Sequence, residues 1–280
     1  MDMLSENDFY WRESNGVRVL VSRLLENEGF INGFSTRLGG VSPFPDGDLN
    51  LAGYDEDSGE NIAENRRRFM AAIGDGYRLA SCWQVHSAEV RHVRDFDDAV
   101  DGDHKMDALV SDAGNVLLGV KTADCVPILL GDTASGAFAA VHAGWRGTVS
   151  SIVVNAVSRM TEAYGTDPAD LIAAIGPAAS VRNYEVGPDV IGAFTENFPG
   201  SEHLFMPTRE GHARIDLHTA NREQLERIGV APERISVSGL CTMERTDLFF
   251  SYRVEKRIYG KTGRLMSVIG RGSDTVSSEQ

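Results

Sequence analysis

The sequence predicts an α+β fold in a single domain. Short apolar runs typical of strands follow one another between residues 108 and 141, too closely for a helical crossover between each pair. That succession favours a mixed or antiparallel sheet with helices packed outside it. The chain shows no internal repeat and no break in composition, so we expect one domain over residues 11–270, between disordered ends at 1–10 and 271–280.

Hydrophobic spacing predicts the elements along the chain. Three stretches place their apolar residues on one helical face and end at a glycine: 62–73 before Gly74, 149–160 before Gly165, and 217–228 before Gly229. The predicted strands are the apolar runs 17–21, 108–110, 116–120, 126–130, 137–141, 171–175, 235–237 and 265–269.

The composition excludes several classes of partner. With 41 acidic and 27 basic residues the net charge is −14 at pH 7, which should repel nucleic acid and anionic membranes. The most apolar stretch, 116–130, is interrupted by Lys121 and Asp124 and is unsuited to span a membrane. The acidic first residues lack the apolar core of a secretory signal. We therefore expect a cytoplasmic protein that binds neither nucleic acid nor membranes.

Three segments concentrate the residues that carry chemistry, each at the end of an apolar run. TADC ends in Cys125, HAGWRG begins at His142, and WQVHS places His86 upstream. One thiol and two imidazoles can bind zinc with an open fourth position, which is the arrangement of catalytic zinc sites. The other cysteines, Cys82 and Cys241, show no spacing typical of a disulfide framework, and Cys241 is expected in the core.

Each residue of this trio also has a plainer interpretation when taken alone. Cys125 could be a buried structural cysteine, and a single histidine such as His86 is usually structural. Asp124, next to Cys125, would raise the pKa of the thiol unless a metal or an arginine intervenes. That neighbour suits a metal ligand better than a free nucleophile.

Candidate substrate-binding residues lie around the trio. Arg146 lies between Gly144 and Gly147, beside the start of a predicted helix that Thr148 could cap, a combination suited to an anion. The loop STRLGGVSPFPDGDLNLAG carries Arg37 and Asn50 and matches no phosphate-binding glycine motif. It is either a surface loop or a lid that brings Arg37 to an anion. Tyr184 offers a ring that could stack on a base.

Taken together, GFSTRLGGVS, LNLAG, WQVHS, DALVSD, TADCVPILL, VHAGWRGT, IGP, YEVG, CT and FFSYR resemble the motifs of the YfiH family. It is also called the multicopper polyphenol oxidase or laccase-domain family. The resemblance implies a sandwich of mixed sheets with flanking helices, and metal ligands at His86, Cys125 and His142. It also implies a zinc-dependent purine nucleoside phosphorylase acting on adenosine, inosine and methylthioadenosine, with adenosine deaminase activity.

In such an enzyme the partners are a small nucleoside and phosphate. Arg37 and Arg146 would position the phosphate, and Asp124 is a candidate proton shuttle beside the catalytic Cys125. Zinc would also lower the pKa of a bound water from about 15.7 toward about 7, which deamination requires.

Other functions use the same residues. A copper oxidase is one, because two histidines and a cysteine also make an electron-transfer copper site. A laccase further needs paired HxH motifs, and none of the seven histidines forms one, so copper is disfavoured. A hydrolase that edits peptidoglycan precursors, a role associated with some bacterial members, would use Cys125 as nucleophile and His142 as base. The non-enzyme alternative is a binding module in which the site is structural.

Overall fold

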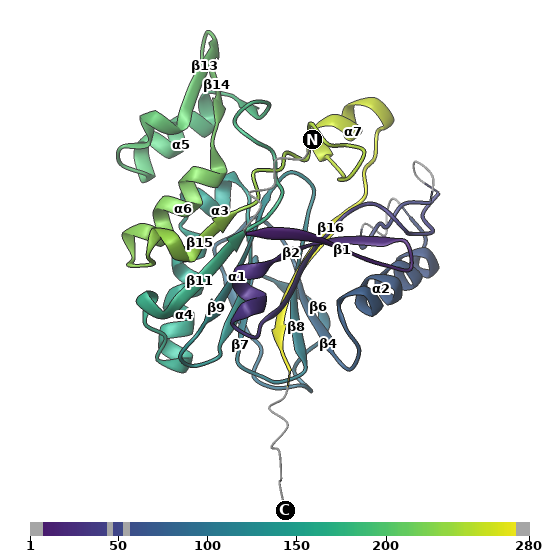
Figure 1. Cartoon of the computed structure of the whole chain (residues 1–280). Coiled ribbons are helices and arrows are strands. Elements are labelled where there is room, and N and C mark those ends of the chain that lie inside the picture. Colours follow the sequence, from purple (N-terminus) through teal and green to yellow (C-terminus); the bar gives the residue numbers. More distant parts are fainter. Residues whose placement is uncertain (1–7, 44–46, 53–56, 273–280) are drawn as a thin grey trace, which may run out of the picture.

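Two mixed β-sheets packed face to face form the centre of the protein (Figure 1). The computed structural model describes residues 8–43, 47–52 and 57–272. The larger sheet has seven strands in the order β1 (Phe9–Ser14), β2 (Val17–Ser22), β3 (Ile31–Ser35), β16 (Leu265–Arg271), β8 (Val116–Thr122), β4 (Arg78–Trp83) and β6 (Asp101–Lys105). Its strands pair antiparallel except that β4 runs parallel to both β8 and β6.

The smaller sheet supplies the other half of the sandwich. Its order is β15 (Ile235–Val237), β11 (Leu171–Ile175), β9 (Val126–Asp132), β10 (Phe138–Ala143), β7 (Ala108–Ser111) and β5 (Val90–His92). The central pairs are antiparallel, and the two edge pairs, β15 with β11 and β5 with β7, are parallel. The chain crosses from one sheet to the other between β8 and β9.

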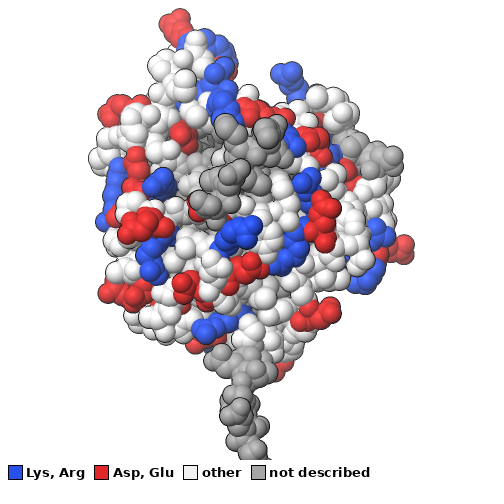
Figure 2. All heavy atoms as spheres, viewed as in Figure 1, with Lys and Arg blue, Asp and Glu red and all other residues white. Residues whose placement is uncertain are grey.

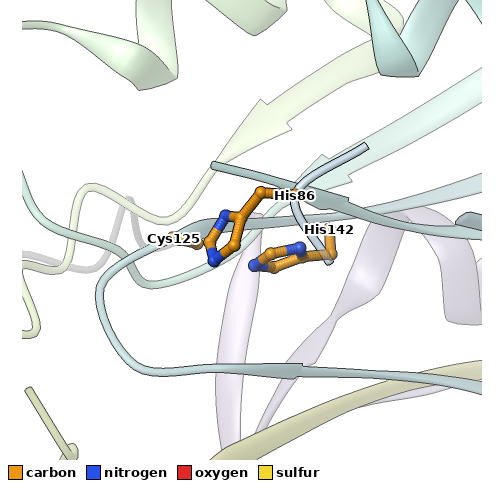
Figure 3. Close-up of side chains that lie close together, drawn as sticks. All are labelled: His86, Cys125 and His142. Carbon is orange, nitrogen blue, oxygen red and sulfur yellow. The ribbon is translucent and has the colours of Figure 1, made fainter. Parts of the chain in front are cut away.

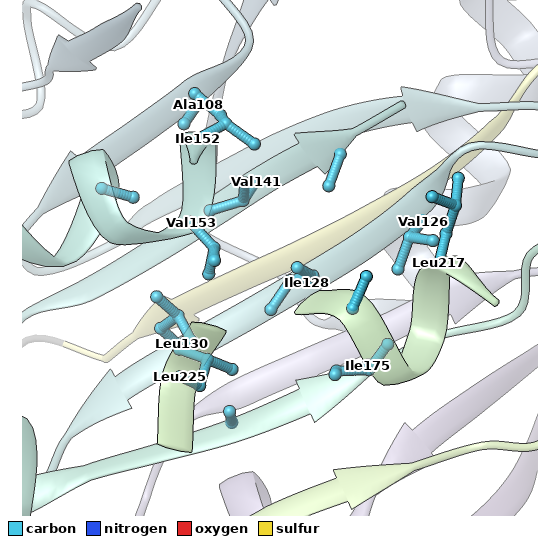
Figure 4. Close-up of a cluster of buried hydrophobic side chains, with 14 of the residues drawn as sticks. Ala108, Val126, Ile128, Leu130, Val141, Ile152, Val153, Ile175, Leu217 and Leu225 are labelled. Atoms are coloured by element: carbon cyan, nitrogen blue, oxygen red, sulfur yellow. The ribbon is translucent and has the colours of Figure 1, made fainter. Parts of the chain in front are cut away.

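Helices cover the outer face of each sheet, so the fold has four layers. Helices α4 (Ile152–Tyr164) and α6 (Leu217–Arg227) pack on the smaller sheet, and α2 (Gly59–Ile73) packs on the larger one. Both faces of strand β9 are apolar because both are buried. Val126, Ile128 and Leu130 point toward α4 and α6 (Figure 4), while Leu129 points into the core between the sheets.

The remaining elements gather mainly around one end of the sandwich. A small antiparallel sheet, β12 (Glu185–Val186), β14 (His212–Ile215) and β13 (Phe205–Arg209), projects there with α5 (Pro188–Asn197), and α7 (Tyr252–Tyr259) lies at the same end (Figure 1). The short helices are α1 (Arg23–Asn27) and α3 (Trp145–Val149). The 3₁₀ turns are η1 (Pro168–Asp170), η2 (Ser201–Leu204) and η3 (Pro232–Arg234).

The predicted α+β class is confirmed, and all eight predicted strands and the three helical segments are present. The helix expected at 149–160, however, is two helices, α3 and α4. Ser151, with a φ of 58°, separates them. Thr148 lies inside α3, whose N-cap is Gly144, and its hydroxyl accepts a hydrogen bond from Asn221. The prediction that Thr148 caps the helix is therefore wrong.

The disordered start expected at 1–10 is too long. Strand β1 begins at Phe9, which is buried in the core between the sheets. At the other end, Arg271 closes β16, although the disordered tail was expected from that residue. Residues 1–7 and 273–280 of the two expected tails lie outside the described residues.

Two surface properties bear on the excluded partners. Within the described part of the chain, no helix is both long and apolar enough to cross a membrane. On the face shown in Figure 2, acidic and basic side chains are interspersed, and no continuous basic stripe crosses it. The expectation that nucleic acid is not a partner rests on the net charge of −14.

Candidate metal centre

Three side chains from three separate segments converge where the two sheets meet. His86 follows β4, Cys125 lies in the crossing between β8 and β9, and His142 is in β10. One ligand atom of each lies within 4.8 Å of the others, and the two imidazole centroids are 5.0 Å apart (Figure 3). The structure thus brings together the three residues that the sequence suggested as metal ligands.

The donor set and the space around it fit a metal ion. A thiolate and two imidazoles are the donors that zinc prefers, and three protein ligands leave a position for substrate. Gly144 explains part of the HAGWRG motif. A Cβ at this residue would lie 2.7 Å from Nδ1 of His86 and 3.1 Å from Sγ of Cys125. Only glycine leaves both ligands undisturbed here.

Asp107 holds two of the three ligands in place. Its buried carboxylate accepts a hydrogen bond from Nδ1 of His142 at 2.8 Å. The same carboxylate accepts the main-chain N–H groups of Val85, His86 and Ser87 and the Ser87 hydroxyl. With Nδ1 occupied as a donor, Nε2 of His142 is the nitrogen left to bind a metal ion. The bonds to the main chain also stabilise His86, whose φ of 60° is unusual for a non-glycine residue.

The electrostatics of the centre favour a thiolate. Burial tends to raise the pKa of Cys125, but the imidazoles of His142 and His86 outweigh it and lower the value to about 6. Burial tends to lower the pKa of His142, but the thiolate of Cys125 and the carboxylate of Asp107 raise it to about 9. Despite its burial, Asp107 has a pKa of about 2, because His142 and Ser87 donate hydrogen bonds to it. The protein therefore prepares an anionic sulfur, which is the form that binds metal.

Asp124 organises the other side of the centre. It has a φ of 87°, and its buried carboxylate accepts the Thr242 hydroxyl at 2.7 Å and the main-chain N–H of Arg253 at 2.7 Å. Its main-chain carbonyl accepts the N–H of Ala179 at 2.9 Å. Burial raises the pKa of the Asp124 carboxyl. The segments that begin with IGP, CT and SYR thus meet at the residue before Cys125.

Tyr184 and Arg253 form a stacked pair beside this aspartate. The guanidinium of Arg253 lies 4.8 Å from the centre of the Tyr184 ring and donates to the main-chain oxygen of Glu185 at 2.7 Å. Burial, followed by the charge of Cys125, raises the pKa of Tyr184 to about 12. The phenol therefore lies within electrostatic range of the Cys125 thiolate.

Arg146 lies in the first turn of α3, two residues after Gly144. Its guanidinium is exposed and stacks on Trp145 at 4.2 Å from the ring centre. Within the described ranges no carboxylate pairs with it, so its positive charge is available to an anion.

The structure gives Arg37 a different role from the expected one. Its buried guanidinium pairs with Asp48 at 2.6 Å and Glu255 at 2.7 Å, donates to the carbonyl of Thr246, and lies over the ring of Phe250. Two carboxylates already compensate its single positive charge, so Arg37 has no uncompensated charge with which to bind a substrate anion. Arg37 instead ties the N-terminal loop to α7.

Asn50 is likewise a structural residue. Its side-chain oxygen accepts the main-chain N–H groups of Ala52 and Arg264, and its carbonyl accepts the side chain of Asn65. The residue is buried and its amide oxygen faces the protein. The expected contact of Asn50 with substrate therefore has no support in the geometry, because its polar groups serve to close the loop onto β16 and α2.

Asp107 and Gln84 support the site but were not among the residues predicted from the sequence. The carboxamide of Gln84 pairs with the main chain of Lys121, donating to its carbonyl and accepting its N–H, and so fixes the start of the loop that carries His86. Asp107 stands directly before a buried strand in DALVSD, a position at which a charged residue needs partners. A charged residue directly before a buried strand is therefore the feature of the sequence that could have identified Asp107. Cys241 is buried, as expected.

Comparison with known proteins identifies the family. A model described as "multi-copper polyphenol oxidoreductase laccase" matches residues 31–272. The chain belongs to this laccase family. A curated relative from Deinococcus radiodurans, named purine nucleoside phosphorylase, is 42% identical over 241 residues, which cover 85% of this chain and 87% of the relative. Purine nucleoside phosphorylase YlmD of Bacillus subtilis is 35% identical over 254 residues, covering 87% and 89%.

Solved structures show the same laccase-family fold. The crystal structure of YlmD from Geobacillus stearothermophilus has a TM-score of 0.86 and 32% identity, and the match covers 95% of this chain and 99% of that one. The crystal structure of the hypothetical protein YfiH from Bacillus licheniformis has a TM-score of 0.82 and 30% identity, covering 94% and 98%. These likenesses confirm the predicted mixed-sheet sandwich over nearly the whole chain.

Proposed function

We propose that the chain is a zinc-dependent purine nucleoside phosphorylase. The observation that carries the proposal is the convergence of His86, Cys125 and His142 within 4.8 Å, in a chain 42% identical to a relative named purine nucleoside phosphorylase. The substrates are then a purine nucleoside and inorganic phosphate. Because the three cysteines are free and Cys125 must stay reduced to bind metal, we place the enzyme in the cytoplasm.

Zinc fits the site better than copper. When bound, zinc acts as a Lewis acid that stabilises negative charge. A laccase also needs a trinuclear copper cluster, but in the part of the chain that the structure describes, only His86, Cys125 and His142 form a group of three or more potential ligands. The histidines needed for a second copper centre are not assembled there.

The other residues bind and orient the two substrates. Phosphorolysis breaks the bond between the purine N9 and the ribose C1′ and forms a bond from C1′ to a phosphate oxygen. Arg146 offers an exposed guanidinium for the phosphate, and the ring of Tyr184 can stack on the purine. We assign Asp124 primarily a positioning role, because both of its carboxylate oxygens already accept hydrogen bonds. To serve as the proton shuttle it would have to break one of them.

An incubation of the zinc-loaded protein with adenosine, with and without phosphate, tests the proposal. Chromatography separates adenine, the product of phosphorolysis, from inosine, the product of the deaminase activity that the family resemblance implies. We expect adenine only with phosphate present, and we expect little of any product from His142→Ala. Adenine release that is independent of phosphate, or equal in the variant, would reject the assignment.

Two alternatives have their own outcomes in the same experiment. Inosine without adenine would make the protein a deaminase rather than a phosphorylase. A peptidoglycan-precursor hydrolase using Cys125 and His142 would release no purine. It would also be active without zinc, because a nucleophilic thiolate cannot be tied up as a ligand.

A further inference from the structure

An arginine outside the expected substrate-binding set stands at the edge of the metal centre. We propose that Arg253 binds the anionic substrate group, which is inorganic phosphate if the proposed phosphorolysis is correct. Only the identity of the anion rests on the proposed function. The assignment of Arg253 as an anion-binding residue rests on its position, its orientation and its charge.

The position of Arg253 is fixed relative to a metal ligand. Its main-chain N–H donates to Asp124 at 2.7 Å, and Asp124 is covalently joined to Cys125. The other oxygen of Asp124 accepts the hydroxyl of Thr242 at 2.7 Å, so the carboxylate is held from two sides. The first turn of α7 is therefore anchored one residue away from the thiolate.

The orientation of the guanidinium is fixed as well. Its plane is supported by the ring of Tyr184 at 4.8 Å, and one of its nitrogens, Nη1, donates to the carbonyl of Glu185 at 2.7 Å. An arginine has five N–H donors in a rigid fork, so most of them remain available. The side chain is nevertheless exposed to solvent. A substrate can therefore reach a guanidinium that is already ordered.

Arg253 forms no salt bridge with a carboxylate of the described residues, and only Asp124 lies near enough for its charge to act on it. The two carboxylates beside it hold other donors: Glu185 accepts from Thr208 and Arg209, and Asp124 accepts from Thr242 and the main-chain N–H of Arg253. In a chain with a net charge of −14, most arginines have acidic partners, as Arg209 does. An ordered arginine without one, beside a metal site, is suited to a phosphate, which accepts two parallel hydrogen bonds from a guanidinium.

Arg257 provides a matched control on the same helix. It lies one turn after Arg253 in α7, is also exposed, and has no partner among the residues that the structure describes. Unlike Arg253, it makes no contact with Asp124 or Tyr184. Replacing either arginine by glutamine removes one positive charge from α7, so only the local geometry differs between the two variants.

The test is a calorimetric titration of zinc-loaded wild type, Arg253→Gln and Arg257→Gln with inorganic phosphate, followed by the KM for phosphate and for nucleoside. We expect Arg253→Gln to weaken phosphate binding about 10- to 100-fold, the usual effect of losing a charge-assisted hydrogen bond. The KM for nucleoside should change less. Arg257→Gln should stay within about twofold of wild type, because exposed charges are screened by salt. Arg253→Lys, which keeps the charge but loses the fork, should fall between.

Zinc content and thermal unfolding of Arg253→Gln show whether the loss arises at the anion site, and both should match wild type. Equal phosphate affinity in Arg253→Gln and Arg257→Gln overturns the inference, and so does a wild type that binds no phosphate. Phosphate binding that depends on Arg253, without turnover of any nucleoside, would leave the anion site standing and reject the proposed function.

Discussion

The carboxylate of Asp107 accepts the Nδ1–H of His142 at 2.8 Å, and the same carboxylate binds the main chain of His86. One buried side chain therefore orients two of the candidate metal ligands, which belong to segments of different sheets. On the opposite side, Asp124 joins Cys125 to the segment that carries Arg253. Asp107 therefore supports the two histidines, whereas Asp124 supports the side of the site where Arg253 lies.

Asp107→Asn should weaken metal binding. The amide cannot offer two anionic oxygens to the five donors that surround Asp107, so His142 and the His86 loop lose their orientation. Loss of such a supporting carboxylate typically lowers metal affinity by about 10- to 100-fold. Competition for zinc with a chromophoric chelator measures the change.

Asp132→Asn is the matched control for this experiment. Asp132 is also buried and closes a turn by accepting hydrogen bonds from Ala134 and Ser135, but it ends β9 about 20 Å from Cys125. It should lower the stability of the fold without changing the zinc affinity. A similar zinc affinity for Asp107→Asn and wild type would show that the carboxylate does not organise the metal site.

Gly144→Ala should disrupt the centre by steric overlap. The added methyl group would lie 2.7 Å from His86 Nδ1 and 3.1 Å from Cys125 Sγ, so at least one ligand must move. We expect most of the zinc to be lost, as measured by metal analysis. Gly192→Ala, in the middle of α5 with no atom within 4 Å of the new Cβ, should keep its zinc. It should also gain up to about 1 kcal/mol of stability. Full zinc occupancy in Gly144→Ala would contradict the packing account.

Arg37→Gln should act on stability rather than on phosphate. Its removal leaves the buried carboxylates of Asp48 and Glu255 without their shared counter-charge, which typically costs about 3–5 kcal/mol. Urea unfolding measures the loss. Arg222→Gln, which breaks a partly exposed pair with Glu226 at the surface, should cost less than about 1 kcal/mol. Unchanged stability with a large rise in the KM for phosphate would restore the substrate role that the sequence suggested for Arg37.

Alkylation of the metal-free protein should be selective and pH-dependent. The pKa of Cys125 is about 6, because two imidazoles stabilise its thiolate, so its reaction with iodoacetamide should rise through pH 6 and level off near pH 7. Cys82 is buried, which raises its pKa to about 11, and it should not react. Peptide mass spectrometry assigns the modified residue. Zinc should protect Cys125, and rapid alkylation of Cys125 in the zinc-loaded protein would argue against ligation.

The sequence predicted most of the sandwich because its central strands are continuous apolar runs. Some of the strands that it missed are polar and lie at sheet edges, such as β6, DGDHK, and β13, FMPTR. Others, β3, INGFS, and β4, RLASCW, lie inside the larger sheet, but glycine and polar residues interrupt their apolar runs. Helix α7 escaped detection because eight residues give only two turns of periodicity. The break between α3 and α4 depends on the left-handed conformation of Ser151, which composition does not reveal.

The sequence predicted the site residues whose role follows from their residue type. It did not predict the roles that depend on which distant residue a side chain pairs with. A cysteine and two histidines at strand ends indicate a metal centre by their donor atoms alone. Whether Arg37 meets substrate depends on Glu255, 218 residues away in the sequence, and no local pattern shows that pair. The structural role of Asp107 likewise depends on two distant segments that fold onto it.

The zinc content of the purified protein and of its ligand variants, measured with the phosphorolysis rate of each, tests the central claim most directly. We expect about one zinc per chain in the wild type. Cys125→Ala and His142→Ala should lose zinc and purine release together, while Cys82→Ala keeps both. Purine release by protein that has been stripped of metal, or full zinc occupancy in Cys125→Ala, would contradict the account.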